Sequence, residues 1–85
     1  MKHTPQSPEM IAASHLLYYY NASGGYPGGS FANKLIELMD MADKENLEKL
    51  LKAYPEYEFG VRMLQESGKN KLSNYVLAVR YGVTP

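Results

Sequence analysis

A glycine-rich segment is the sequence feature that most restricts how this chain can fold. Residues 21–30 read Asn-Ala-Ser-Gly-Gly-Tyr-Pro-Gly-Gly-Ser and hold four of the seven glycines in the 85-residue sequence. Glycine readily adopts positive φ, so such a density of glycines, together with a proline, cannot continue a helix. The segment therefore predicts a structured turn or loop that separates a first helix from the rest of the chain.

The first helix is predicted directly before this loop. Ser7 is suited to be its N-cap and Pro8 its first residue. Apolar residues then recur with helical spacing at Met10, Ala13, Leu17 and Tyr20. Residues 1–7 are polar and contain Pro5, so they predict a flexible N-terminal arm.

Two helices are predicted after the loop, each with an N-cap and an apolar face. Ser30 is the expected N-cap of the second helix, and Asp43 that of the third. The expected core face of the second helix is Phe31, Leu35, Leu38 and Ala42. The third helix offers Leu47, Leu50, Leu51 and Tyr54.

A fourth helix is expected to begin at Pro55, which is tolerated at the first position of a helix. Gly60 lies within it, where glycine costs about 1 kcal/mol relative to alanine, so we expect another helix backbone to pass closely there. Gly68 is predicted to end this helix, with residues 69–71 as a turn.

The last element, from Leu72 to Tyr81, is ambiguous. Its tyrosines and valines favour a strand by propensity, whereas Leu72, Val76 and Val79 fit one face of a helix. We predict a helix, because a single strand would have no partner to pair with. The sequence thus predicts an all-α fold, a compact bundle of four to five short helices. We expect this bundle to form one domain of residues 8–82, followed by a tail of residues 83–85.

Charge and composition exclude several classes of protein. Nine basic residues balance nine acidic residues, and the two kinds alternate along the chain, which argues against nucleic-acid binding. A helix-turn-helix with residues 43–54 as the second helix is disfavoured because this segment carries as much acid as base. The chain has no cysteine, the start lacks the apolar core of a signal peptide, and no stretch has the roughly 20 apolar residues of a membrane span. We expect a cytoplasmic protein that does not enter membranes.

No residue pattern indicates catalysis or a cofactor. His3 and His15 are the only histidines, and neither has a second ligand at metal-binding spacing. The carboxylates considered as acid or base are all explained by exposed helix faces or helix starts: Glu9, Glu37, Asp40 and Glu56. Three serines were considered as nucleophiles, and none lies in a recognised nucleophile motif: Ser14, Ser23 and Ser30. We therefore predict no enzymatic activity, no cofactor and no metal.

Three consecutive tyrosines lead into the glycine segment, which contains a fourth. Successive residues of a helix point about 100° apart, so Tyr18, Tyr19 and Tyr20 cannot all enter one core. Exposed tyrosine is enriched at recognition surfaces, and we predict a protein-binding surface at Tyr18, Tyr19 and Tyr26. The alternative is that two of these rings complete the core and another covers the glycine loop.

The glycine segment also leads into a helix start, which presents unpaired N–H groups to an anion. The residues Gly28, Gly29 and Ser30 could hold an anion, although the segment matches neither a P-loop nor G-x-G-x-x-G. An alternative function is thus a small-molecule or nucleotide-binding sponge, in which assembled subunits bury the ligand between the glycine loop and the helix starts at Ser30 and Asp43. The glycines are explained more simply by a turn between helices.

Residues 17–64 resemble a group of small uncharacterised proteins of bacteriophages and prophages. The similarity lies in Tyr19-Tyr-Asn, Gly25-Tyr-Pro-Gly-Gly-Ser-Phe31, Leu35-Ile36, Ala42-Asp43, Asn46 and Tyr54-Pro-Glu-Tyr57. In that group a helix, a Gly-Tyr-Pro-x-Gly-Ser-Phe turn and an Ala-Asp-x-x-Asn helix start follow in this order. This chain departs from it with Lys-Ala-Tyr before Pro55, where the group has Gly-Phe. The resemblance implies a phage accessory protein in the host cytosol and carries over no catalytic residue.

Taken together, these features predict a non-enzymatic accessory protein that binds a host or phage protein, or itself, through its tyrosine-rich surface. Small size and neutral charge suit an assembly of identical copies. The identity of the partner is not encoded in any motif.

Overall fold

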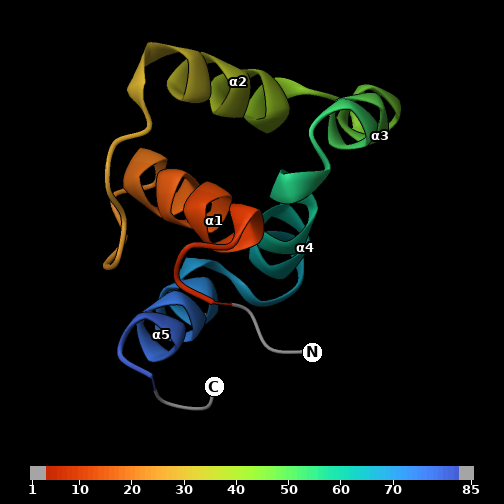
Figure 1. The fold of residues 1–85 in the computed structure, drawn as a ribbon. Helices are drawn as coiled ribbons and strands as arrows, with labels where there is room; N and C mark the ends of the chain where they lie inside the picture. The colour runs from red at the N-terminus through yellow and green to blue at the C-terminus, as the bar shows by residue number, and fades with distance from the viewer. Residues whose placement is uncertain (1–3, 83–85) are drawn as a thin grey trace.

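The computed structural model describes residues 4–82, and within this range the chain forms five α-helices, one short 3₁₀-helix and no strand (Figure 1). The elements are α1 (Pro8–Tyr19), α2 (Gly29–Met41), α3 (Lys44–Ala53), η1 (Pro55–Tyr57), α4 (Glu58–Ser67) and α5 (Lys69–Arg80). The predicted all-α bundle is confirmed, and the ambiguous last element is a helix. Residues 1–3 of the predicted arm, with His3, and the predicted tail of residues 83–85 lie outside the described range.

Helix α1 lies at the centre of the molecule and contributes to two apolar clusters. In Figure 1 it lies between α2 above and α5 below, with α4 beside it. Ala12 and Leu16 of α1 belong to a cluster with buried residues of α2, α3, η1 and α4. Met10, Ala13 and Leu17 of α1 join Leu72 and Val76 of α5 in the second cluster. Because α1 packs against other helices on two sides, it is apolar over much of its circumference.

Two of the three predicted N-caps are confirmed. The Ser7 hydroxyl accepts from the backbone N–H of Met10 at 3.3 Å, and Asp43 Oδ1 accepts from the backbone N–H of Asn46 at 2.8 Å. The predicted Ser30 cap is wrong, because α2 begins at Gly29 with Gly28 as N-cap and has no side-chain cap hydrogen bond. Gly29 has a φ of 90°, which lets the chain turn into the helix two residues earlier than a Ser30 N-cap would place the start.

The predicted core face of α2 is also partly wrong. Phe31 and Leu38 are exposed, and the residues buried in α2 are Ala32, Leu35, Ile36 and Met39. Apolar residues occur on most sides of this helix, so its sequence contains two stripes with helical spacing. The buried stripe packs in the first cluster through Leu35, Ile36 and Met39, which leaves the other stripe on the surface.

The second half of the chain is more continuously helical than predicted. Pro55 begins a single 3₁₀ turn, and α4 proper starts at Glu58. The predicted turn of residues 69–71 is helical, because Gly68 at a φ of 90° joins α4 directly to α5. The expected close approach at Gly60 is confirmed, since a Cβ there would lie 2.5 Å from Leu16 Cδ1 and 3.6 Å from Ala13 Cα of α1. None of the helices within residues 4–82 is both long and apolar enough to span a bilayer.

Candidate functional site

The glycine loop, residues 20–28, lies flat against α1. A Cβ on Gly25 would lie 2.3 Å from the backbone nitrogen of Tyr18 and 2.7 Å from the carbonyl carbon of Leu17. The next residue, Tyr26, donates its backbone N–H to the carbonyl oxygen of Ser14 at 3.3 Å. Only glycine permits this backbone-to-backbone approach, so the glycine at position 25 is explained by packing.

Side chains of α5 bind the carbonyl oxygens of the same loop. Arg80 Nη2 donates to the Gly24 carbonyl at 2.8 Å and to Ser14 Oγ at 3.1 Å. Ser73 Oγ donates to the carbonyl of Ser23, and Lys69 Nζ donates to the carbonyl of Tyr20 at 3.1 Å. The loop is thus held from two sides, and bonds from a charged donor are the stronger kind. Sequence reasoning missed Arg80, because its partners lie 56 and 66 residues earlier in the chain.

The structure separates the tyrosines that were predicted to form one surface. Tyr18 and Tyr26 are 46% and 41% exposed. Tyr19 and Tyr20 are half-buried against the first cluster, with their rings edge to face at 5.0 Å. Tyr19 and Tyr20 therefore pack on the core, while Tyr18 and Tyr26 are exposed on the surface.

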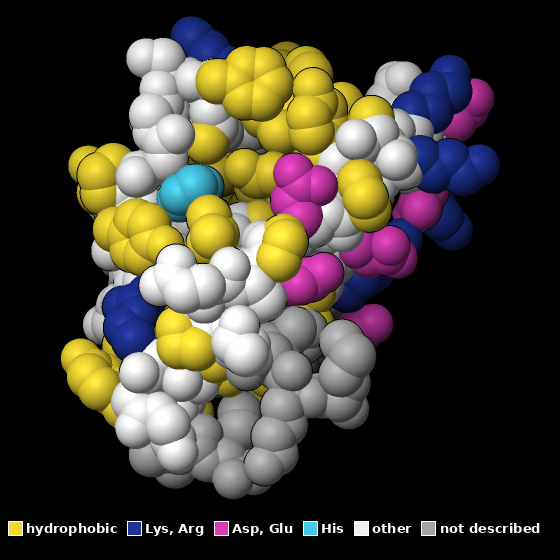
Figure 2. Space-filling view, in the orientation of Figure 1, with side chains coloured by type: hydrophobic (Ala, Val, Ile, Leu, Met, Phe, Trp, Pro, Cys, Tyr) yellow, Lys and Arg dark blue, Asp and Glu magenta, His cyan; other side chains and the backbone are white. Residues whose placement is uncertain are grey.

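Tyr26 is fixed between two other side chains. Its ring meets the imidazole of His15 edge to face at a centroid distance of 5.6 Å. The guanidinium of Arg80 lies 5.6 Å from the centroid of the same ring, within the range of a cation–π contact. We call the exposed Tyr18 and Tyr26, together with the His15 and Arg80 that contact Tyr26, the tyrosine surface. Figure 2 shows hydrophobic side chains gathered around the histidine on the left of the molecule, whereas charged side chains gather over α3 at the upper right.

The predicted anion-binding residues lie at the start of α2. Gly28 packs against His15, since a Cβ on this glycine would lie 2.6 Å from the imidazole ring. No side chain caps the first backbone N–H groups of α2, which leaves them able to bind an anion. The start of α3 differs, because the carboxylate of Asp43 already accepts a hydrogen bond from this helix start.

Polar groups that were considered for catalysis have structural contacts. Asp40 Oδ1 accepts a hydrogen bond of 2.7 Å from the Tyr20 hydroxyl. Burial, followed by this hydrogen bond, raises the pKa of Tyr20 well above its usual value of 10.0, so the phenol stays protonated and links α1 to α2. Glu37 lies 3.7 Å from Lys34. Within residues 4–82 there is no group of three or more side chains of His, Cys, Asp or Glu that could hold a metal ion.

His15 gives the stability of the fold a pH dependence. Burial lowers the pKa of His15 below its usual value of 6.5, so the unfolded chain binds this proton more tightly than the folded protein. The free energy of unfolding should therefore decrease as the pH falls through the unfolded pKa toward the lower folded pKa. We expect a smaller drop between about pH 7.5 and about pH 5.5 for His15→Gln than for the wild type, measured by urea unfolding. Equal drops in the two proteins would contradict this assignment.

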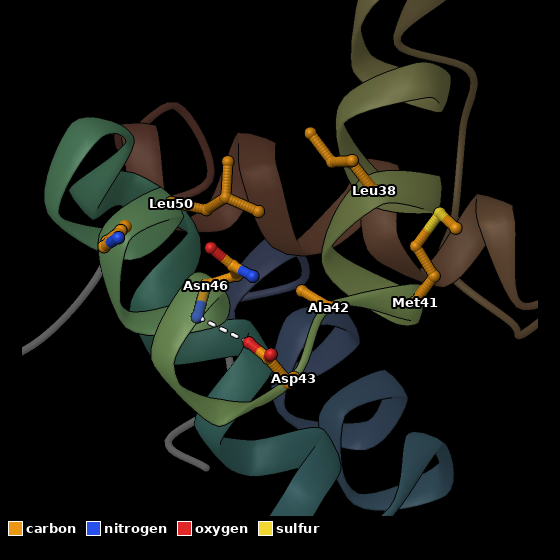
Figure 3. A pocket seen from close by; sticks show the side chains of 7 residues that line it. Leu38, Met41, Ala42, Asp43, Asn46 and Leu50 are labelled. Atoms are coloured by element: carbon orange, nitrogen blue, oxygen red, sulfur yellow. Dashed lines mark hydrogen bonds between the residues drawn. The ribbon is translucent and has the colours of Figure 1, made fainter.

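A second apolar area, missed in the sequence, lies along α2. Its exposed members are Phe31, Leu38 and Met41, and we call them the α2 face. The face borders a pocket of about 470 Å³ between α2 and α3 (Figure 3). The signal that could have found it is the second apolar stripe of α2, which sequence reasoning assigned to the core.

Comparisons with models of protein families, with curated proteins and with solved structures found no match to this chain.

Proposed function

We propose that this chain is a non-enzymatic accessory protein of the phage type that binds a protein partner through the tyrosine surface. One observation carries the proposal: Tyr18 and Tyr26 are large, partly exposed aromatic side chains held on a backbone that is fixed from two sides. Rigid, amphipathic rings lose little conformational entropy when a partner covers them, and tyrosine is enriched among the residues that dominate binding energy.

The chemistry of the surface supports a protein as the partner. The surface offers contact area with few free charges. It holds two phenol rings, an imidazole whose pKa is lowered by burial, and a guanidinium that already binds the loop. Such a composition matches the centre of a protein interface, where aromatic residues and arginine are enriched and other charges are depleted. The resemblance of residues 17–64 to phage and prophage proteins supports a host or phage protein in the host cytosol as the partner.

Substituting Tyr18→Ala and Tyr26→Ala together should weaken binding to a partner captured from host lysate by about tenfold or more, since each ring removes an aromatic contact. Isothermal titration with the purified partner measures the change. Phe31→Ala is the matched control, because it removes an exposed aromatic ring on α2 and should leave this affinity unchanged. An unchanged affinity of the tyrosine variant, with its circular dichroism intact, would contradict the proposal.

Sequestration of a small anionic ligand is the second candidate function. It is supported by the uncapped start of α2 at Gly28, Gly29 and Ser30. A thermal-shift series with cyclic and linear nucleotides at millimolar concentration separates it from protein binding, because a ligand that binds the folded state raises the unfolding temperature.

A further inference from the structure

Acidic and basic residues alternate only in the middle of this chain, which corrects the sequence-based interpretation. Eight of the nine acidic residues lie between Glu37 and Glu66, and the ninth is Glu9 near the start of α1. Residues 10–36 and 67–82 therefore contain no carboxylate side chain. These two segments hold most of α1, the glycine loop, the start of α2 and all of α5. The tyrosine surface is built from them alone, so it brings basic charge without any acidic charge of its own.

The basic residues that hold the glycine loop make no ion pair, unlike several basic residues in the middle of the chain. Lys34, Lys49 and Arg62 form ion pairs with carboxylates at 3.7, 3.8 and 2.9 Å. Within residues 4–82, neither Lys69 nor Arg80 has such a partner, and both donate to carbonyl oxygens of the loop instead. A carbonyl group carries no net charge, so both side chains keep their full positive charge.

Arg80 places this charge at the edge of an exposed ring. Its guanidinium lies 5.6 Å from the centroid of Tyr26, and both of its hydrogen bonds to the protein are donated by Nη2. The side chain is only partly buried, so its other nitrogens can donate to a group of another molecule. On the face drawn in Figure 2, the acidic side chains all lie to the right of the histidine. A carboxylate from outside could therefore bind the guanidinium beside Tyr26 by charge-assisted hydrogen bonds, with no acidic neighbour to repel it.

We propose that the tyrosine surface binds an acidic segment of its protein partner, in which a carboxylate pairs with Arg80 and apolar side chains cover the exposed rings. This partner chemistry rests on the proposed function of the tyrosine surface. Complementary charge of this kind fixes the register of a complex and speeds its formation.

A nucleic acid is the other kind of polyanion that could bind here. Its affinity depends on neutralising several successive phosphates. Lys69 and Arg80 are eleven residues apart, which is roughly 16 Å along α5, and both already bind the loop. A single protein carboxylate needs only one guanidinium, so the arrangement favours an acidic protein segment.

Selection of random peptides displayed on yeast, with the purified chain as bait, tests the proposal. The enriched peptides should carry Asp or Glu beside apolar residues, and they should not bind the variant with Tyr18→Ala and Tyr26→Ala. Enriched peptides that are neutral or basic, and still depend on the two tyrosines, would overturn the acidic partner and leave the proposed function intact. Enriched peptides that bind the tyrosine variant equally well would overturn both.

Synthetic versions of the most enriched peptide measure the contribution of charge by fluorescence polarisation. Replacing its carboxylates by amides should weaken binding by about tenfold or more at low salt. Arg80→Gln should weaken the acidic peptide by a similar factor and leave the amide peptide nearly unchanged, which separates a lost charge from a displaced loop. Equal weakening of both peptides by Arg80→Gln would overturn the pairing with Arg80.

Two further measurements complete the test. Lys71→Gln is the matched control, because it removes the same charge from an exposed position of α5 that lies beside Met63 and Ser67 of α4. This variant should bind the acidic peptide as tightly as the wild type does, and an equal loss with Arg80→Gln would overturn a specific pairing. A single-stranded dT oligonucleotide should compete poorly with the peptide, and tighter binding of the oligonucleotide would overturn a protein partner in favour of nucleic acid.

Discussion

Gly25→Ala should destabilise the fold by about 3 kcal/mol or more, measured by urea unfolding followed by circular dichroism. The added Cβ would lie 2.3 Å from the backbone nitrogen and 2.6 Å from the Cα of Tyr18. Backbone atoms within a helix cannot rotate away as a side chain can, so the loop itself has to move. Its movement would stretch the hydrogen bonds from Tyr26 N–H to Ser14 and from Arg80 to Gly24.

Gly29→Ala is the control that separates steric overlap from backbone strain. Nothing lies within 4 Å of a Cβ at Gly29, but its φ of 90° is unfavourable for alanine, at a cost of about 1–2 kcal/mol. Gly25 has no such φ, so its cost comes from overlap alone. If Gly25→Ala were no more destabilising than Gly29→Ala, the glycine loop would not be packed tightly against α1. That result would contradict the claim that the backbone of Tyr26 is rigidly held.

The local signals in the sequence predicted most of the helices correctly. Ser7 and Asp43 marked helix starts that the structure confirms, because an N-cap depends only on residues three positions apart. The deciding interactions of these caps lie within a few residues of one another, so the sequence contains all that is needed to recognise them. The helix α5 was predicted differently, because its local signals were ambiguous and a single strand would have had no partner to pair with.

The orientation of α2 could not be predicted from its sequence. Two apolar stripes lie along this helix, and the buried one packs in a cluster built jointly with α1, α3, η1 and α4, which is a tertiary property. The contacts that hold the glycine loop are equally invisible, since Arg80 and Ser73 bind carbonyls 50 or more residues away. Sequence reasoning therefore placed the tyrosine-rich segment correctly on a helix end and a loop, but it included the half-buried Tyr19 and missed Arg80.

The packing of α1 between other helices determines where the fold is most sensitive to substitution. One side of this helix faces α2, η1 and α4, and another side faces α5. Leu17 is completely buried on the α5 side, in the cluster with Leu72 and Val76, and its Cδ1 also lies 3.6 Å from the position of a Cβ on Gly24. The same side chain thus packs beneath both α5 and the loop that α5 holds.

Leu17→Ala should lower the free energy of unfolding by about 2–5 kcal/mol, because it removes a fully buried side chain and leaves a cavity that rigid neighbours cannot fill. For a chain of this size that is a large part of the total stability, which is about 4–13 kcal/mol. Leu38→Ala is the same change at an exposed position and should cost less than about 0.5 kcal/mol in dilute, monomeric protein. Urea unfolding of both variants measures the difference. Equal losses would mean that Leu17 is not packed in a closed core beneath α5, since its burial is what makes it costlier to truncate than Leu38.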